Sequence, residues 1–83
     1  MNKAIQLEIL CVDNIVYKGP VARVQVPGEL GSFEILYNHA PLISSLVKGK
    51  IRVIDLEKKT TFIEVESGVL EVSDNHIVIL MGS

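Results

Sequence analysis

The sequence has few of the residues that mark metal sites, disulfides or catalysis. It contains one cysteine, two histidines and no tryptophan in 83 residues. A single cysteine cannot form an intramolecular disulfide, which fits a reducing compartment, and Cys11 is expected to be a small buried thiol. Zinc ligands come in pairs at short spacing, and His39, His76 and Cys11 are too dispersed to form such a site. We therefore expect no metal and no cofactor.

Motifs for phosphate, nucleic acid and catalysis are also missing. The six glycines never form the glycine-rich spacing that cradles phosphate before a helix. The net charge is −2, and the lysines and arginines form no basic stripe interleaved with aromatic residues. Ser44, His39 and Asp55 could be assembled into a triad on paper, but no strained nucleophile turn accompanies them. We expect no nucleic-acid partner, no small-molecule substrate and no catalysis.

Long apolar runs are absent as well. The longest, Ile77 to Met81, is far short of the ~20 residues that a membrane-spanning helix requires. Near the N-terminus polar residues recur at every second place, which excludes a signal peptide. We expect no direct membrane insertion, so any link to a membrane must go through another protein.

What the sequence does contain is alternation of apolar and polar residues, which is typical of half-buried strands. Gly19-Pro20 and Pro27-Gly28 are expected to end strands, since both are strong turn signals. Residues 41–47 fit either a helical turn or a strand, and we favour the strand. The predicted strands are 6–12, 15–18, 21–26, 32–37, 41–47, 50–56, 60–66, 68–72 and 76–81.

Eight or nine short strands with a turn every eight to twelve residues predict an all-β sandwich or barrel in a single domain, residues 1–83. The strand from Ile77 to Met81 is apolar on both faces, which predicts a central or covered position. A domain of this kind without a catalytic constellation is expected to act by binding other proteins.

Two linked stretches, Val26 to Phe33 and Asn38 to Leu42, carry a distinctive order and spacing. They resemble the N-terminal domain of the epsilon subunit of F-type ATP synthases. Residues 7–9, 17–19, 48–53 and 67–72 are similar to other parts of that domain, so the resemblance covers essentially the whole chain. Two positions depart from the family pattern, because Glu34 stands where Gly is usual and Tyr37 where Pro is usual.

The resemblance implies an all-β sandwich of two about five-stranded sheets. It also implies a non-catalytic rotor subunit that links the gamma subunit to the membrane proteolipid ring and couples proton transport to ATP synthesis. Its location would be the cytoplasmic face of the bacterial inner membrane, on the periphery. The family normally continues into a two-helix hairpin that carries inhibition and, in some members, ATP binding. This sequence stops at Ser83, which implies a coupling domain without that hairpin.

Site residues are implied position by position. The loop that rests on the proteolipid ring in the family matches Glu29, Leu30, Gly31 and Ser32. The parts that lie toward gamma match Leu10, Cys11, His39, Leu42 and Ser44. Taken by itself, His39 fits equally well a residue that hydrogen-bonds its own loop and a contact residue displayed by that loop.

An alternative of similar length is a lipoyl- or biotin-carrier domain, whose modified lysine sits at a hairpin tip. Lys58 and Lys59 occupy such a tip. The flanking Glu57 and Thr60 do not reproduce the carrier pattern, and adjacent lysines at a turn are usually solvated residues. The carrier domain is therefore the second interpretation.

Overall fold

The computed structural model describes residues 3–82, which form eight β-strands and no helix. The strands are β1 (Ile5–Cys11), β2 (Asn14–Gly28), β3 (Gly31–Ile35), β4 (Leu42–Leu46), β5 (Gly49–Asp55), β6 (Thr60–Val65), β7 (Gly68–Ser73) and β8 (His76–Met81). The ambiguous segment 41–47 is thus a strand, as favoured. Nowhere in residues 3–82 is there a helix that could cross a membrane.

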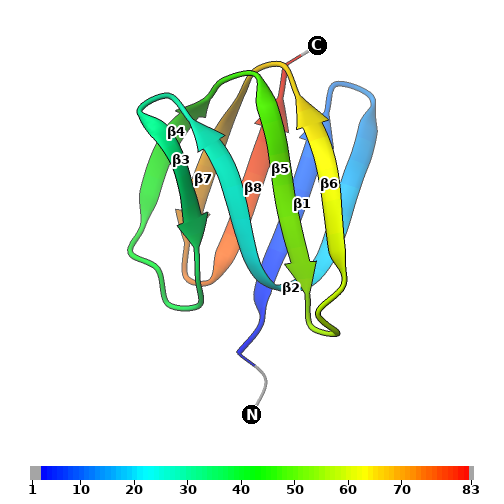
Figure 1. The fold of residues 1–83 in the computed structure, drawn as a ribbon, viewed down its shortest axis with the longest axis vertical. Coiled ribbons are helices and arrows are strands. Elements are labelled where there is room, and N and C mark those ends of the chain that lie inside the picture. Colours follow the sequence, from blue (N-terminus) through cyan, green and yellow to red (C-terminus); the bar gives the residue numbers. More distant parts are fainter. Residues whose placement is uncertain (1–2, 83) are drawn as a thin grey trace.

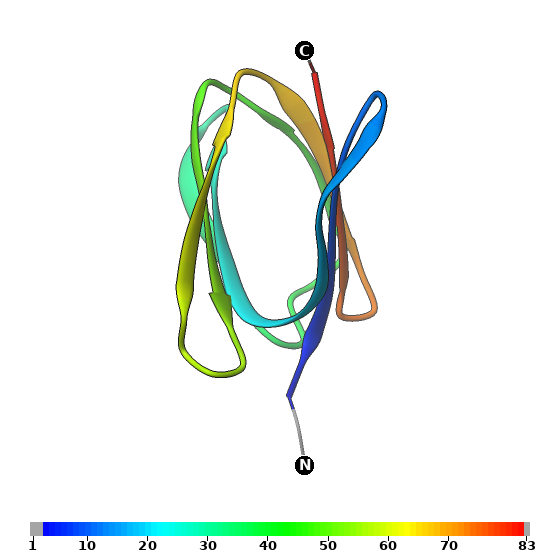
Figure 2. The same cartoon turned by 90° about the vertical axis from the view of Figure 1, so that its right-hand side faces the viewer.

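The strands stack in two layers, and β2 runs through both of them (Figures 1 and 2). One layer, here the first layer, contains the start of β2, then β1, β8, β7 and β4. The second layer contains β3, the end of β2, β5 and β6. All pairs are antiparallel except β1 with β8. The predicted sandwich is confirmed, with five and four strand segments in its layers.

The prediction that Gly19-Pro20 ends a strand is wrong, because β2 continues through both residues. Pro20 lies opposite Gln6 of β1, in the part of β2 that has a strand partner on one side only. Proline lacks an N–H donor and is tolerated at such an edge. A bulge follows at Ala22, where the register with β5 shifts. One extra residue bends a strand, and here the bend carries β2 from one layer to the other.

The second expected turn is displaced by two residues. Pro27 and Gly28 belong to β2, and the turn itself consists of Glu29 and Leu30. Gly28 pairs with Gly31 to close this hairpin. A Cβ atom at Gly28 would lie 2.7 Å from the Phe33 ring, so the glycine serves close packing. Pro-Gly is a common turn pair, but here the two residues end strand β2 just before the turn and are not part of the turn itself.

The buried hydrophobic side chains between the layers are aliphatic, the partly buried Tyr17 and Phe33 pack against them, and no buried residue in 3–82 is polar. Ile9 of β1, Ile79 of β8 and Leu70 of β7 lie side by side in register, each with 0% exposure. Strand β8 lies between β1 and β7, as its two apolar faces predicted. Its outer side chain Leu80 is nevertheless 54% exposed, so the first layer is uncovered there.

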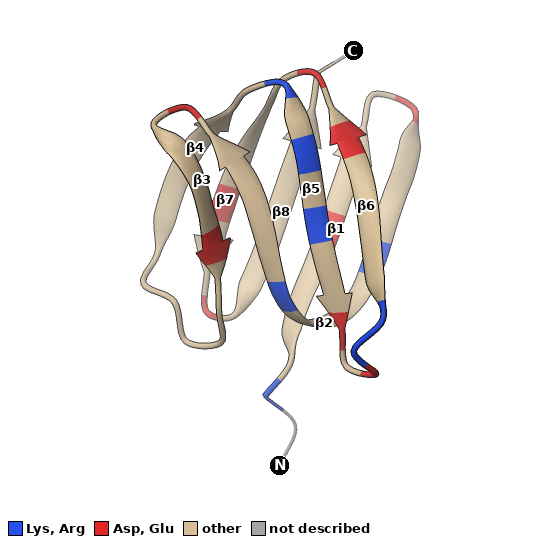
Figure 3. Ribbon diagram, in the orientation of Figure 1, with Lys and Arg blue, Asp and Glu red and all other residues tan. Residues whose placement is uncertain are grey.

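The outer face of the second layer is charged (Figure 3). Glu34 of β3 lies 3.6 Å from Arg23 of β2 and 3.7 Å from Arg52 of β5. Because the three side chains are partly exposed, this ionic cluster is solvated and contributes little stability. The departure from the family's usual glycine at position 34 therefore adds a surface charge that two arginines neutralise.

The outer face of the first layer carries a row of apolar side chains instead. Its members come from four neighbouring strands in register, and they are Ile15, Leu10, Leu80 and Val69. Ile15 is 63% exposed and Val69 is 46% exposed. The same face also carries Glu8, Glu71 and His76, with His76 Nε2 3.0 Å from a carboxylate oxygen of Glu8, so its apolar character is confined to this row.

Candidate functional site: a groove at the open side of the sandwich

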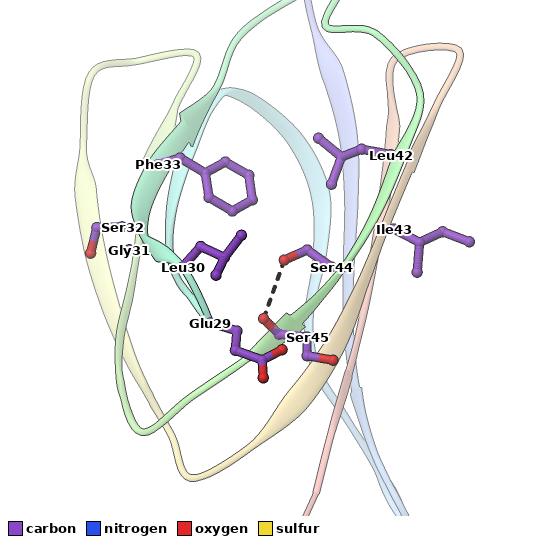
Figure 4. A pocket seen from close by; sticks show the side chains of 9 residues that line it. All are labelled: Glu29, Leu30, Gly31, Ser32, Phe33, Leu42, Ile43, Ser44 and Ser45. Atoms are coloured by element: carbon purple, nitrogen blue, oxygen red, sulfur yellow. Dashed lines mark hydrogen bonds between the residues drawn. The ribbon is translucent and has the colours of Figure 1, made fainter.

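A groove of about 670 Å³ lies between the tip of the β2–β3 hairpin and strand β4 (Figure 4). Phe33 and Leu42 come from opposite layers, point into this groove and pack against the core. Ile43 points away from it, and Leu30 at the tip is fully exposed. The lining residues are Glu29, Leu30, Gly31, Ser32, Phe33, Leu42, Ile43, Ser44 and Ser45.

Backbone hydrogen bonds fix the hairpin against β4 at the closed end of the groove. The N–H of Glu29 donates to the carbonyl of Ser45 at 3.0 Å. The N–H of Val47 donates to the carbonyl of Pro27 at 2.9 Å. These bonds join the ends of β2 and β4 and so fix the distance between the two walls of the groove.

The groove brings together residues from the two sets of predicted contacts, which are separate segments of the sequence. The ring-contact loop, Glu29–Ser32, forms one wall, and Leu42 and Ser44, assigned to gamma contact, belong to the other. The hydroxyl of Ser44 donates to the carbonyl of Ser45 at 3.2 Å. Sequence reasoning missed Phe33 as a lining residue, although the alternation of β3 places it on the inner face opposite Leu42.

His39 does not line the groove, and it lies in the loop between β3 and β4. Its Nδ1 donates to the carbonyl of Ala40 at 2.7 Å, so the imidazole holds its own loop. Asn75, in the turn between β7 and β8, anchors that loop, because its Nδ2 donates to Oδ1 of Asn38 at 3.0 Å. Asn38 has a φ of 65°, a conformation that asparagine tolerates better than most residues. The structure thus shows His39 hydrogen-bonding its own loop, and its contact with gamma stays a prediction.

Leu10 and Cys11 lie at the end of β1, away from the groove. Leu10 is half-buried and belongs to the apolar row on the outer face of the first layer. Cys11 is a free thiol that is only half-buried, so the expectation of a buried thiol is wrong. The strand ends at this residue and the chain turns at Val12 and Asp13, which leaves one side of the thiol open.

Glu29 is the one ionisable side chain among the residues that line the groove, and a group with a shifted pKa lies outside it, in β2. Burial raises the pKa of Tyr17 in β2, and the nearby carboxylate of Asp55 raises it further. Asp55 itself shapes the β5–β6 turn, since its Oδ1 accepts N–H donors from Glu57 at 2.8 Å and Lys59 at 2.9 Å. Residues 3–82 contain no cluster of three His, Cys, Asp or Glu that could hold a metal ion. The groove can offer apolar contact and backbone hydrogen bonds.

Lys58 and Lys59, the residues of the carrier interpretation, are exposed in the β5–β6 turn. Lys58 has a φ of 67°, and the amide of Lys59 is held by Asp55. Their position at a hairpin tip agrees with the sequence prediction. It gives the carrier interpretation no further support, since solvated lysines at a turn take the same position.

Comparisons with known proteins identify the fold and its family. The family model described as "ATP synthase, Delta/Epsilon chain, beta-sandwich domain" matches residues 4–83. The chain is 35% identical over 79 residues to the ATP synthase epsilon chain of Chlorobium limicola, covering 95% of this chain and 90% of that one. It is 41% identical over 76 residues to the epsilon chain of Leptospira borgpetersenii, covering 92% of this chain but 59% of that one. This chain thus spans nearly the whole of the first relative but only about three fifths of the second.

Solved structures show the same architecture. A chain of the Euglena gracilis mitochondrial ATP synthase (OSCP/F1/c-ring) aligns with a TM-score of 0.90 at 20% identity, covering 98% of this chain and 52% of that one. A chain of the Tetrahymena thermophila mitochondrial ATP synthase (central stalk/c-ring) gives 0.77 at 13% identity, covering 94% and 63%. The family model and the relatives favour the epsilon-chain interpretation over the carrier domain. The chain belongs to the ATP synthase epsilon-chain family, as its β-sandwich domain.

Proposed function

We propose that this chain is the rotor subunit that joins gamma to the proteolipid ring and so couples proton transport to ATP synthesis. The epsilon chain is a non-catalytic subunit of ATP synthase. Its contribution would be mechanical, because it would transmit torque from the ring to the central shaft without converting a substrate. The site would be the cytoplasmic face of the bacterial inner membrane, where the chain would be held by its partners.

One observation carries this proposal, namely the groove that the ring-contact and gamma-contact residues share. Leu30 stands fully exposed at one rim, while Ser44 lies on the opposite wall. Because Leu30 lies at the tip of a two-residue turn with its side chain fully exposed, it would be free to contact a partner. Two partners that meet at this end of the sandwich would be locked to the same rigid body.

The fold also suits the transmission of force. Hydrogen bonds run without a break from one layer to the other because β2 belongs to both. The core contains no buried polar residue among residues 3–82, and its buried side chains form one cluster. Protein interiors of this kind are poorly compressible and transmit strain. A load applied at the hairpin tip would therefore reach the far end of the first layer with little deformation.

The gamma contact can be tested with two matched charge substitutions. Ser44→Asp places a carboxylate in the groove, whereas Phe62→Asp places one on the outer face of the second layer, where Phe62 is 62% exposed. Binding to the gamma subunit of the same organism would be measured by calorimetry. We expect Ser44→Asp to weaken binding about tenfold or more and Phe62→Asp to leave it unchanged, since a desolvated unpaired charge is costly. Equal affinities would remove the groove from the gamma interface.

The ring contact has its own test. Leu30→Asp should reduce capture of the detergent-solubilised proteolipid ring, because Leu30 would rest on it. The fold should be unaffected, since this side chain is fully exposed. Unchanged capture would exclude the hairpin tip as the ring contact.

A further inference from the structure

The groove is bordered by two strand edges that have no strand partner within residues 3–82. Strand β3 pairs with β2 alone. Strand β4 pairs with β7 along its length, and on its other side it meets β2 only where Leu46 faces Gly28. Most of that side of β4 is therefore open, next to the groove.

The direction of the backbone groups on β4 follows from two bonds that are already present. The carbonyl of Ser45 accepts the N–H of Glu29, so the main-chain groups of Ser45 face away from β7. In an antiparallel strand every second residue points the same way. The N–H and C=O of Ile43 must therefore face the open edge, while those of Leu42 and Ser44 face β7.

The two edges differ in their protection. Natural proteins guard exposed edges with charged residues, bulges or a covering segment. Strand β3 carries Glu34, which is engaged with two arginines. Strand β4 has the sequence LISSL, with no charge and no bulge, and Ile43 is 75% exposed. A strand edge that lacks these protections and borders an apolar groove is suited to pairing with a further strand.

We propose that an extended segment of the gamma subunit adds to the free edge of β4 at Ile43 as a further strand. This inference rests on the proposed function. The segment would bond the N–H and C=O of Ile43, and its inward side chains would cover Phe33 and Leu42. In such strand addition the backbone bonds supply affinity and the side-chain pockets supply specificity. The occupant would be extended, because helical backbone has its own donors and acceptors already paired.

Gamma is the chosen partner because the added strand would lie against Leu42 and Ser44, the residues that match the family's gamma-facing segment. The ring-contact loop lies across the groove from β4, and its hairpin pairs with β4 only where Gly28 faces Leu46, so a strand added at Ile43 would lie directly against Leu42 and Ser44. A second copy of this chain could also pair through β4, and the experiment distinguishes that case.

The test is hydrogen exchange at single amides, measured by NMR on the chain alone and in complex with gamma. We expect the Ile43 amide to exchange readily in the free chain and to become at least about tenfold slower in the complex. The amides of Leu42 and Ser44 are internal controls, since they already face β7, and gamma should protect them little further. Unprotected Ile43 in a formed complex would overturn the inference but leave the proposed function standing. Failure to form any complex would overturn both.

A pair of variants gives a second readout. Ile43→Pro removes the N–H donor, and Ile43→Ala keeps it while removing a side chain that points away from the groove. We expect about tenfold weaker gamma binding for the proline variant and less than about threefold change for alanine. Equal affinities would contradict strand addition. Protection of Ile43 that rises with the concentration of the chain alone would show pairing between two copies and would also contradict it.

Discussion

The rigidity of the sandwich depends on its aliphatic core, which predicts the effect of Ile79→Ala. Ile79 lies in the central strand β8 with 0% exposure, between Ile9 and Leu70. The substitution removes three carbon atoms, worth about 0.8 kcal/mol each, and leaves a cavity. We expect a loss of about 3–4 kcal/mol. A chain of 83 residues has an unfolding free energy of about 4–12 kcal/mol, so this loss is severe.

The assay is urea unfolding followed by circular dichroism at 25 °C, with two controls. Leu80→Ala changes the next residue of the same strand, but its side chain is 54% exposed, so we expect about 1 kcal/mol or less. Ile79→Val should cost about 0.5–1.5 kcal/mol and keeps the test usable if the alanine variant is largely unfolded. Similar losses for Ile79→Ala and Leu80→Ala would refute the assignment of β8's inner face to the core.

Two further perturbations follow from single residues. Gly68→Ala should destabilise the fold by about 1–3 kcal/mol, because a Cβ there would lie 2.7 Å from the backbone carbonyl oxygen of Leu80, whereas the exposed neighbour Ser67→Ala should cost less than about 0.5 kcal/mol in the same denaturation. In Tyr37→Phe, where Tyr17 is the remaining tyrosine, tyrosinate absorbance should rise with a midpoint above 10.0, because burial and Asp55 raise the pKa of Tyr17. The fold favours the neutral phenol of Tyr17. The contribution of this phenol to the free energy of unfolding is therefore complete below its ordinary pKa and is lost as pH rises through the raised one. Tyr17→Phe should remove that loss, and a midpoint at or below 10.0 would contradict the partly buried position of Tyr17 beside Asp55.

The strands were predictable because apolar residues that face the core alternate along each strand with polar residues that face outward. Val24 and Val26 with Arg23 and Gln25 show it clearly, and the structure buries the first pair and not the second. The errors fell on proline and glycine. We expected Pro20 to end a strand, but its missing N–H donor matters only where a partner strand lies on that side of the chain. The local sequence does not reveal which side of a strand is open.

The groove was harder to predict than the strands. Its walls come from β3 and β4, and their distance is set by the bond between Glu29 and Ser45, which the local pattern does not encode. The resemblance supplied Leu42 and Ser44 without showing that they face the ring-contact loop. The open edge at Ile43 depends on which neighbours β4 lacks, and only the three-dimensional pairing shows that.

The central claim is that one rigid sandwich holds gamma and the proteolipid ring together. The most direct measurement is a bridging assay, in which tagged gamma is immobilised and the detergent-solubilised ring is added with and without this chain. We predict that the ring is retained only when the chain is present, and that retention falls with Leu30→Asp or Ser44→Asp but not with Phe62→Asp. Equal retention of the ring with and without the chain would contradict the account.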